Sequence, residues 1–129
     1  MRIYQDSRTL ARDIFAHLGS ALEVGLPLGI GKATHVINAL FEEAEKDRSL
    51  TLDILTALTL ERPRASSELE ARFLAPFVER HFKGYVDLSY AVAARRGDLP
   101  GNVRVSEFFL NSGAWLSHAG AQQNYVSAN

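Results

Sequence analysis

The apolar residues of this chain recur with two different spacings, and the two alternate along the sequence. A spacing of three or four residues, as in Leu10, Ile14 and Leu18, is typical of a helix with one buried face. It predicts helices over about 6–18, 34–46, a stretch that begins after Ser67, 87–96 and 113–122. Shorter and more continuous apolar runs predict strands over about 24–30, 50–60, 103–110 and 125–127.

The predicted strand over 50–60 decides the fold class. It alternates at first and then becomes almost wholly apolar, which is typical of a strand covered on both faces and favours a parallel sheet. Helices and strands that alternate imply right-handed crossovers onto such a sheet. We therefore expect a single α/β domain over 1–129, with an open, mostly parallel sheet flanked by helices.

Single residues sharpen several element boundaries. Pro27 cannot donate to a sheet ladder, so the strand around it should be irregular or lie at an edge. Ser67 and Glu70 match a capping box at a helix start, and Gly97 after two arginines marks a helix end. Pro76 falls inside a helical pattern, where its ring predicts a kink or a break just before it.

Composition and charge remove several classes of function. The net charge is -1, from 14 basic and 15 acidic residues, so no basic excess indicates a nucleic-acid partner. The chain has no cysteine, which fits a reducing, cytoplasmic location. It also lacks a run of about 18 apolar residues, so we expect no membrane span. No metal site is expected, because the histidines lack ligand spacing: His17, His35, His81 and His118.

A glycine-rich loop after the first predicted strand is the main candidate for chemistry. Gly29 and Gly31 would let backbone N–H groups approach an anion at the next helix N-terminus, and Lys32 would add positive charge. A Walker phosphate loop would require glycine at Leu26 and serine or threonine at Ala33. A tight turn with a surface lysine explains the same residues, so both interpretations stay open.

Two further groups have a functional and a structural interpretation. The segment 61–64, Glu-Arg-Pro-Arg, could hold a carboxylate or phosphate at a strand's carboxyl end, or form a salt-bridged turn. The carboxylates of Glu42, Glu43 and Glu45 are most simply a solvated helix face. A strand begins to form over 125–127 and the chain then stops at Asn129, so we expect a truncated domain.

Four segments together resemble one family. They are 29–32 (GIGK), 55–63 (LTALTLERP), 107–109 (EFF) with Gly113, and 121–129 (AQQNYVSAN). In order and spacing they resemble the N-terminal region of the acetyl-CoA hydrolase/transferase family, in the branch related to acetate and 4-hydroxybutyrate CoA-transferases. The resemblance covers nearly the whole chain.

The resemblance implies a three-layer α/β domain that is the first of two similar halves. A glutamate of the second half attacks the acyl-CoA carbonyl and passes through an acyl-glutamyl anhydride to a glutamyl-CoA thioester. A small carboxylate then completes transfer, or water completes hydrolysis. Coenzyme A thioester is thus a substrate, and no cofactor is expected. The residues that match substrate-binding segments of the family are Gly29, Gly31, Lys32, Ser127 and Asn129.

No glutamate of this chain lies in the family's nucleophile context, so no catalytic residue is assigned to it. The leading hypothesis is an N-terminal fragment of an acyl-CoA transferase or acetyl-CoA hydrolase, with its catalytic half missing. Such a fragment should expose an apolar patch and self-associate. The alternative is a stand-alone α/β module that binds an anion or a partner without catalysis. A phosphate-loop nucleotidase is a weaker third hypothesis, because its motif is broken.

Overall fold

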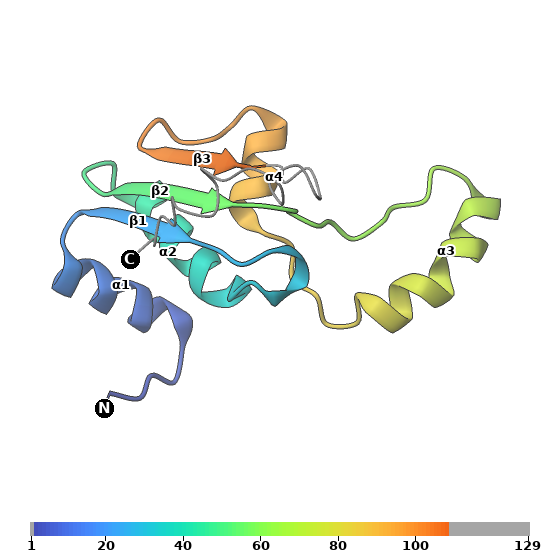
Figure 1. The fold of residues 1–129 in the computed structure, drawn as a ribbon, viewed down its shortest axis with the longest axis horizontal. Coiled ribbons are helices and arrows are strands. Elements are labelled where there is room, and N and C mark those ends of the chain that lie inside the picture. The colour runs from blue at the N-terminus through green and yellow to red at the C-terminus, as the bar shows by residue number, and fades with distance from the viewer. Residues whose placement is uncertain (1, 109–129) are drawn as a thin grey trace, which may run out of the picture.

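The computed structural model describes residues 2–108, which form an open sheet of three parallel strands flanked by four α-helices (Figure 1). The helices are α1 (Ser7–Leu18), α2 (Thr34–Lys46), α3 (Glu68–His81) and α4 (Ser89–Arg96). The strands are β1 (Ala21–Gly25), β2 (Thr51–Thr56) and β3 (Val103–Glu107). The expected α/β class is confirmed, while the helix predicted over 113–122 and the strand over 125–127 lie outside the described residues.

The sheet has the order β1-β2-β3, with β2 in the centre. Its pairing places Leu22, Leu52 and Val103 in one row across the sheet. The helix α2 connects β1 to β2, and the chain passes through α3 and α4 between β2 and β3. Because all strands are parallel, their carboxyl ends lie at the same end of the sheet, which is called the carboxyl edge below.

One face of the sheet carries the core. On β2 the side chains of Leu52, Ile54 and Thr56 are buried, whereas Thr51 and Leu55 between them are exposed. The core continues into the helices through a set of apolar residues at helical spacing: Ala11 and Phe15 of α1, Ile37, Leu40, Phe41 and Ala44 of α2, and Tyr90 of α4. The expectation that both faces of the central strand are covered is therefore wrong for residues 2–108.

Among the described residues, the opposite face is mostly polar, with Leu55 as the apolar exception. The register aligns Glu23, Asp53 and Arg104 across the three strands, and Arg104 forms an ion pair with Asp53. Opposite charges on neighbouring strands stabilise a sheet modestly. The third layer that the resemblance implies is not among the helices that pack on the sheet in this part of the chain.

Two strands end earlier than the sequence predicts. β1 spans Ala21–Gly25 rather than 24–30, so it also begins three residues earlier, and Pro27 follows the strand instead of interrupting it. β2 ends at Thr56, although the apolar run continues to Leu60. Beyond Thr56 the carbonyl groups bond to the loop after β1, and Leu58 adopts a left-handed backbone with φ 46°. The apolar run therefore continues as a turn at the sheet edge.

Helix ends follow the capping signals closely. The Ser67 Oγ accepts a hydrogen bond from the Glu70 amide at 3.2 Å, and Gly97 ends α4 with φ 75°. α3 continues to His81, so of the kink or break predicted before Pro76, the break does not occur. α3 is exposed along its length, so water can bind the carbonyl that the proline leaves without a donor.

Two side-chain features were not predicted. Leu18 is 71% exposed, because α1 turns Ala11 and Phe15 toward the core instead. Asn38 of α2 joins α4 to the body: its Nδ2 donates to the Asp87 carbonyl and its Oδ1 accepts from the Ser89 amide, both at 2.9 Å. Between residues 2 and 108, no helix is long and apolar enough to cross a bilayer.

Candidate functional site

The loop after β1 and the turn after β2 meet at the carboxyl edge of the sheet. The loop contains a short 3₁₀ turn, Gly29–Gly31, and leads directly into α2. Its Gly29 amide donates to the Leu58 carbonyl at 3.2 Å, which ties the loop to the turn that follows β2. Open α/β sheets bind their ligands at this edge, so the predicted loop lies in the right place for a site.

Lys32 is the central side chain of this edge. It is only 7% exposed, and its Nζ donates to the carbonyl oxygens of Pro27 at 2.7 Å, Ala57 at 2.9 Å and Gly29 at 3.4 Å. The three protons of the ammonium group are therefore directed at three backbone acceptors. The interpretation as a surface lysine is wrong, although the tight turn itself is present.

The charge of Lys32 has one nearby counterpart. Burial lowers the pKa of the Lys32 ammonium, and the negative charge of Glu107 raises it by a smaller amount. Glu107 ends β3, and its Oε1 accepts a hydrogen bond from the Thr59 amide at 2.7 Å. Lys32 and Glu107 thus connect the segments that leave all three strands.

The two loop glycines differ in what their backbone requires. Gly29 has φ 62°, a left-handed conformation that disfavours any residue with a Cβ, and an added Cβ would lie 3.8 Å from Leu60. Gly31 has no positive φ, and an added Cβ would meet nothing within 4 Å. The fold explains glycine at 29 but not at 31, which is the position where a ligand's close approach would matter.

An open groove of about 380 Å³ runs beside this loop, lined by residues 32–36 and 84–86. Its volume is within the range of small-molecule sites, about 300–1,000 Å³. The first turn of α2 forms one wall, and Ala33 at its N-cap offers no side chain to the first amide groups. His35 lines the groove and is exposed.

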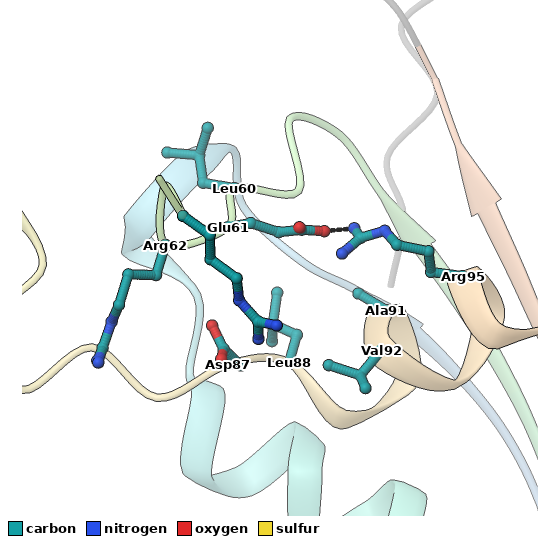
Figure 2. Close-up of a pocket in the computed structure, with 9 residues that line it drawn as sticks. Leu60, Glu61, Arg62, Asp87, Leu88, Ala91, Val92 and Arg95 are labelled. Carbon is teal, nitrogen blue, oxygen red and sulfur yellow. Dashed lines mark ion pairs between the residues drawn. The ribbon is translucent and has the colours of Figure 1, made fainter. Parts of the chain in front are cut away.

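A second hollow lies between the turn after β2 and α4, as Figure 2 shows. Glu61 forms an ion pair with Arg95 across it, and Arg62 donates to the Tyr85 carbonyl at 2.6 Å. The cavity volume is about 20 Å³, which has room for one water molecule. The segment 61–64 is thus salt-bridged, as one of its two interpretations predicted, but the ion pair reaches α4 and residues 61–65 form no turn.

Three buried hydroxyl groups in the described part of the chain have no hydrogen-bond partner: Thr56 Oγ1, Thr59 Oγ1 and the Tyr90 hydroxyl. Thr56 and Tyr90 are almost fully buried, at 0% and 1% exposure. Buried polar groups without partners are rare and costly, and an ordered water is the usual explanation. Sequence patterns could not identify these groups, because threonine and tyrosine are common in strands and cores.

Ser127 and Asn129 lie outside the described residues. The carboxylates of Glu42 and Glu43 pair with Arg8 at 3.4 Å and Arg12 at 3.2 Å of the neighbouring α1, so they join two helices as well as facing solvent. Within residues 2–108, no group of three or more histidines and carboxylates could hold a metal ion.

Comparison with protein-family models, with curated proteins and with solved structures finds no match to this chain. A proposal of function must therefore be argued from the geometry of the carboxyl edge. It combines a buried lysine that holds two turns together with an open groove at the start of a 13-residue helix.

Proposed function

We propose that this chain forms the carboxylate-binding side of the cleft of an acyl-CoA transferase or acetyl-CoA hydrolase, whose nucleophilic glutamate comes from a further domain. The observation that carries the proposal is the position of the loop 29–32. Its residues resemble the family's glycine loop, and the loop borders the groove at the carboxyl edge of the sheet. The proposal includes a cytoplasmic location, as expected for a chain without cysteine.

The groove suits a small carboxylate for electrostatic reasons. In the first turn of α2 no side chain caps the N–H groups, but the Thr34 and Val36 amides donate to the Lys32 and Ala33 carbonyls. The His35 amide and the positive end of the helix dipole are left to attract an anion. The acceptor carboxylate, or the acyl group of the thioester, would bind here with its charge toward the helix. Coenzyme A acts as part of the substrate, so the proposal requires no cofactor.

Lys32 has a positioning role in this proposal. Its ammonium group is shared among the carbonyls of Pro27, Gly29 and Ala57, so it holds the loop in shape at the start of α2. Its charge still contributes to a positive potential at the groove. Binding at a preformed surface requires little reorganisation, which is what a transferase needs to align its acceptor.

A titration followed by amide NMR tests the binding surface. Sodium acetate and acetyl-CoA are added separately to the chain, with sodium chloride at equal ionic strength as the control. We expect saturable shifts in the amide signals of residues 33–36 with either ligand and none with chloride. A chain that responds to neither ligand would contradict the proposal.

Two variants at Ala33 separate charge from shape. Ala33→Asp places a carboxylate at the helix N-cap, where it occupies the anion's position, and should weaken acetate binding at least about tenfold. Ala33→Asn has the same size without the charge and should weaken binding less. Both caps favour the helix, so lost binding cannot be attributed to lost structure. Equal effects from the two variants would show that the charge of the ligand is not recognised.

The missing nucleophile has its own test. Because covalent carboxylate catalysis needs a positioned glutamate with oxyanion donors, the purified chain should not cleave acetyl-CoA in a thiol-release assay. Turnover that disappears when a glutamate of this chain is changed to glutamine would place the nucleophile here instead.

A binding or interaction module without catalysis is the second candidate function. One observation favours it: helix α3 exposes large apolar side chains at Leu69 and Phe73, which are 79% and 82% accessible. An exposed apolar surface marks an interaction site more often than a catalytic one.

A further inference from the structure

Helix α3 stands apart from the body of the molecule (Figure 1). It has no buried residue, and it makes no substantial contact with any other helix or strand of the described chain. Among residues 2–108, only its C-terminal end is anchored, where the centre of the Phe82 ring lies 6.0 Å from that of Phe77 and 5.4 Å from that of Tyr85. Tyr85 in turn donates from its hydroxyl to the Leu60 carbonyl at 2.8 Å.

A helix in this position is not stable by itself. α3 has 14 residues, and isolated helices shorter than about 12–15 residues are marginal in water even for favourable sequences. Pro76 inside it strongly disfavours the helix, whereas the exposed ion pairs Arg72–Glu68 and Lys83–Glu79 stabilise it only weakly. A second surface must therefore cover α3 for the helix to persist.

The exposed side chains of α3 form one stripe. Leu69, Phe73 and Phe77 follow one another at intervals of four residues, and they are 79%, 82% and 47% exposed. The stripe continues to Arg80 at its C-terminal end, because position 80 lies almost a whole number of turns from 73. At the N-terminal end Glu70 folds back and accepts hydrogen bonds from the Ser66 amide and hydroxyl, at 2.7 and 2.6 Å.

We propose that α3 binds α3 of a second copy of this chain, antiparallel, around a two-fold axis that passes beside Phe73. The stripe is symmetric about this residue. Leu69 lies four residues before it and Phe77 four residues after it, so each Leu69 faces Phe77 of the second copy, and the two Phe73 rings meet at the axis.

Charge selects this orientation. Arg80 lies seven residues after Phe73 and Ser66 seven before it, so the antiparallel pair brings Arg80 to Ser66 of the second copy. The Glu70 carboxylate is bonded at Ser66, which creates two symmetric Arg80–Glu70 pairs. A parallel pair would instead place Glu70 beside Glu70 and Arg80 beside Arg80. The antiparallel arrangement also aligns the helix dipoles favourably.

The apolar area of the stripe determines how strongly the two α3 helices associate. Three large apolar side chains at these exposures offer roughly 400 Å² per copy. A stable dimer usually buries about 800 Å² per partner. We therefore expect a weak, reversible dimer, with association over about 10 μM to 1 mM. This inference concerns α3 alone and does not depend on the proposed cleft.

Sedimentation equilibrium of the whole chain tests the pair. The apparent mass should rise from 14.2 kDa toward twice that value over this range. Phe73→Glu places two carboxylates at the axis and should keep the mass at that of one copy throughout. The matched control, Ile3→Glu, changes an equally exposed apolar residue at 76% and should associate as the unmodified chain does. Circular dichroism at low concentration checks that both variants fold.

A charge exchange tests the orientation. Glu70→Arg and Arg80→Glu should each weaken self-association about tenfold, because each variant meets like charges in its own second copy. When the two variants are mixed, one pair is restored with reversed sign and the other as in the unmodified chain, and association should return to within about threefold of the unmodified chain. A defect in the helix cap alone would not recover on mixing.

Three outcomes would overturn the proposal. They are a mass that does not change with concentration, association that survives Phe73→Glu, and a mixture that fails to associate better than either charge variant. The first outcome would mean that another segment or another protein covers α3. The second would place the contact on another surface, and the third would exclude the antiparallel register.

Discussion

The loop around Lys32 and helix α3 both follow strands at the carboxyl edge of the sheet. The loop buries a charged side chain, whereas the helix exposes apolar ones. Lys32 is a charged side chain that is 93% buried and bonded to three carbonyls of its own chain. α3 carries apolar side chains that remain in water. The first region is complete within one copy, so its geometry can serve a ligand directly. The second needs an additional surface, so its geometry indicates a partner.

The largest expected effect comes from comparing alanine substitutions at two phenylalanines. Phe41 of α2 is 3% exposed, whereas Phe73 of α3 is 82% exposed. Phe41→Ala should lower the free energy of unfolding by about 3–5 kcal/mol, since it leaves a cavity in the core. Phe73→Ala should change it by less than about 0.5 kcal/mol in urea unfolding at low micromolar concentration, where the chain is a monomer. Similar losses would mean that α3 is packed within one copy.

The second test removes the charge at the sheet edge. Lys32→Met keeps most of the apolar stem but leaves the Pro27 and Ala57 carbonyls without their donor, and should cost about 2–3 kcal/mol. Lys46→Met is the matched control, because Lys46 is 56% exposed and pairs only with Glu43, and should cost less than about 0.5 kcal/mol. Equal effects would show that the three bonds of Lys32 do not hold the turns.

The pH dependence of the same variant follows from the lowered pKa of Lys32. Burial lowers this pKa below the ordinary value of 10.5, so in alkali the folded chain releases the proton before the unfolded chain does. The unfolded state then binds more protons, and stability due to this group rises with pH from the folded pKa up to 10.5. Unfolding curves from pH 8 upward should show this rise relative to Lys32→Met. If the free energy of unfolding of the unmodified chain, relative to Lys32→Met, fell as pH rose, folding would raise the pKa of Lys32 instead of lowering it.

The sequence predicts most of the local structure because the signals are local. The stripe of α2, with Ile37, Leu40 and Phe41, is buried as its spacing predicts. The caps at Ser67 and Gly97 also act where expected. The end of β2 was missed for a tertiary reason: residues after Thr56 are apolar enough for a strand, but β1 ends at Gly25 and β3 at Glu107, so no partner strand continues beside them.

The candidate site was predictable only in its position. The glycine loop after the first strand indicates a turn at the carboxyl edge, and it is found there. The burial of Lys32 depends on the carbonyl of Ala57, which lies 25 residues away in sequence, so no local pattern could reveal it. The groove likewise needs residues 84–86 to close beside α2. Periodicity describes which face of an element is buried, but it does not give the partners of a single polar group.

The smallest expected changes in the free energy of unfolding come from alanine substitutions at the two loop glycines. They also test the proposed binding of a ligand. Gly29→Ala forces a Cβ onto a backbone with φ 62° and should lower the free energy of unfolding by about 1–2 kcal/mol. Gly31→Ala meets open space with no positive φ, and should change stability by less than about 0.5 kcal/mol. If glycine at 31 serves the close approach of a ligand, the same variant should still weaken acetate binding in the amide titration. A Gly31→Ala chain that binds acetate unchanged would leave this glycine without a role in the site, and would move the ligand toward His35 and the far side of the groove.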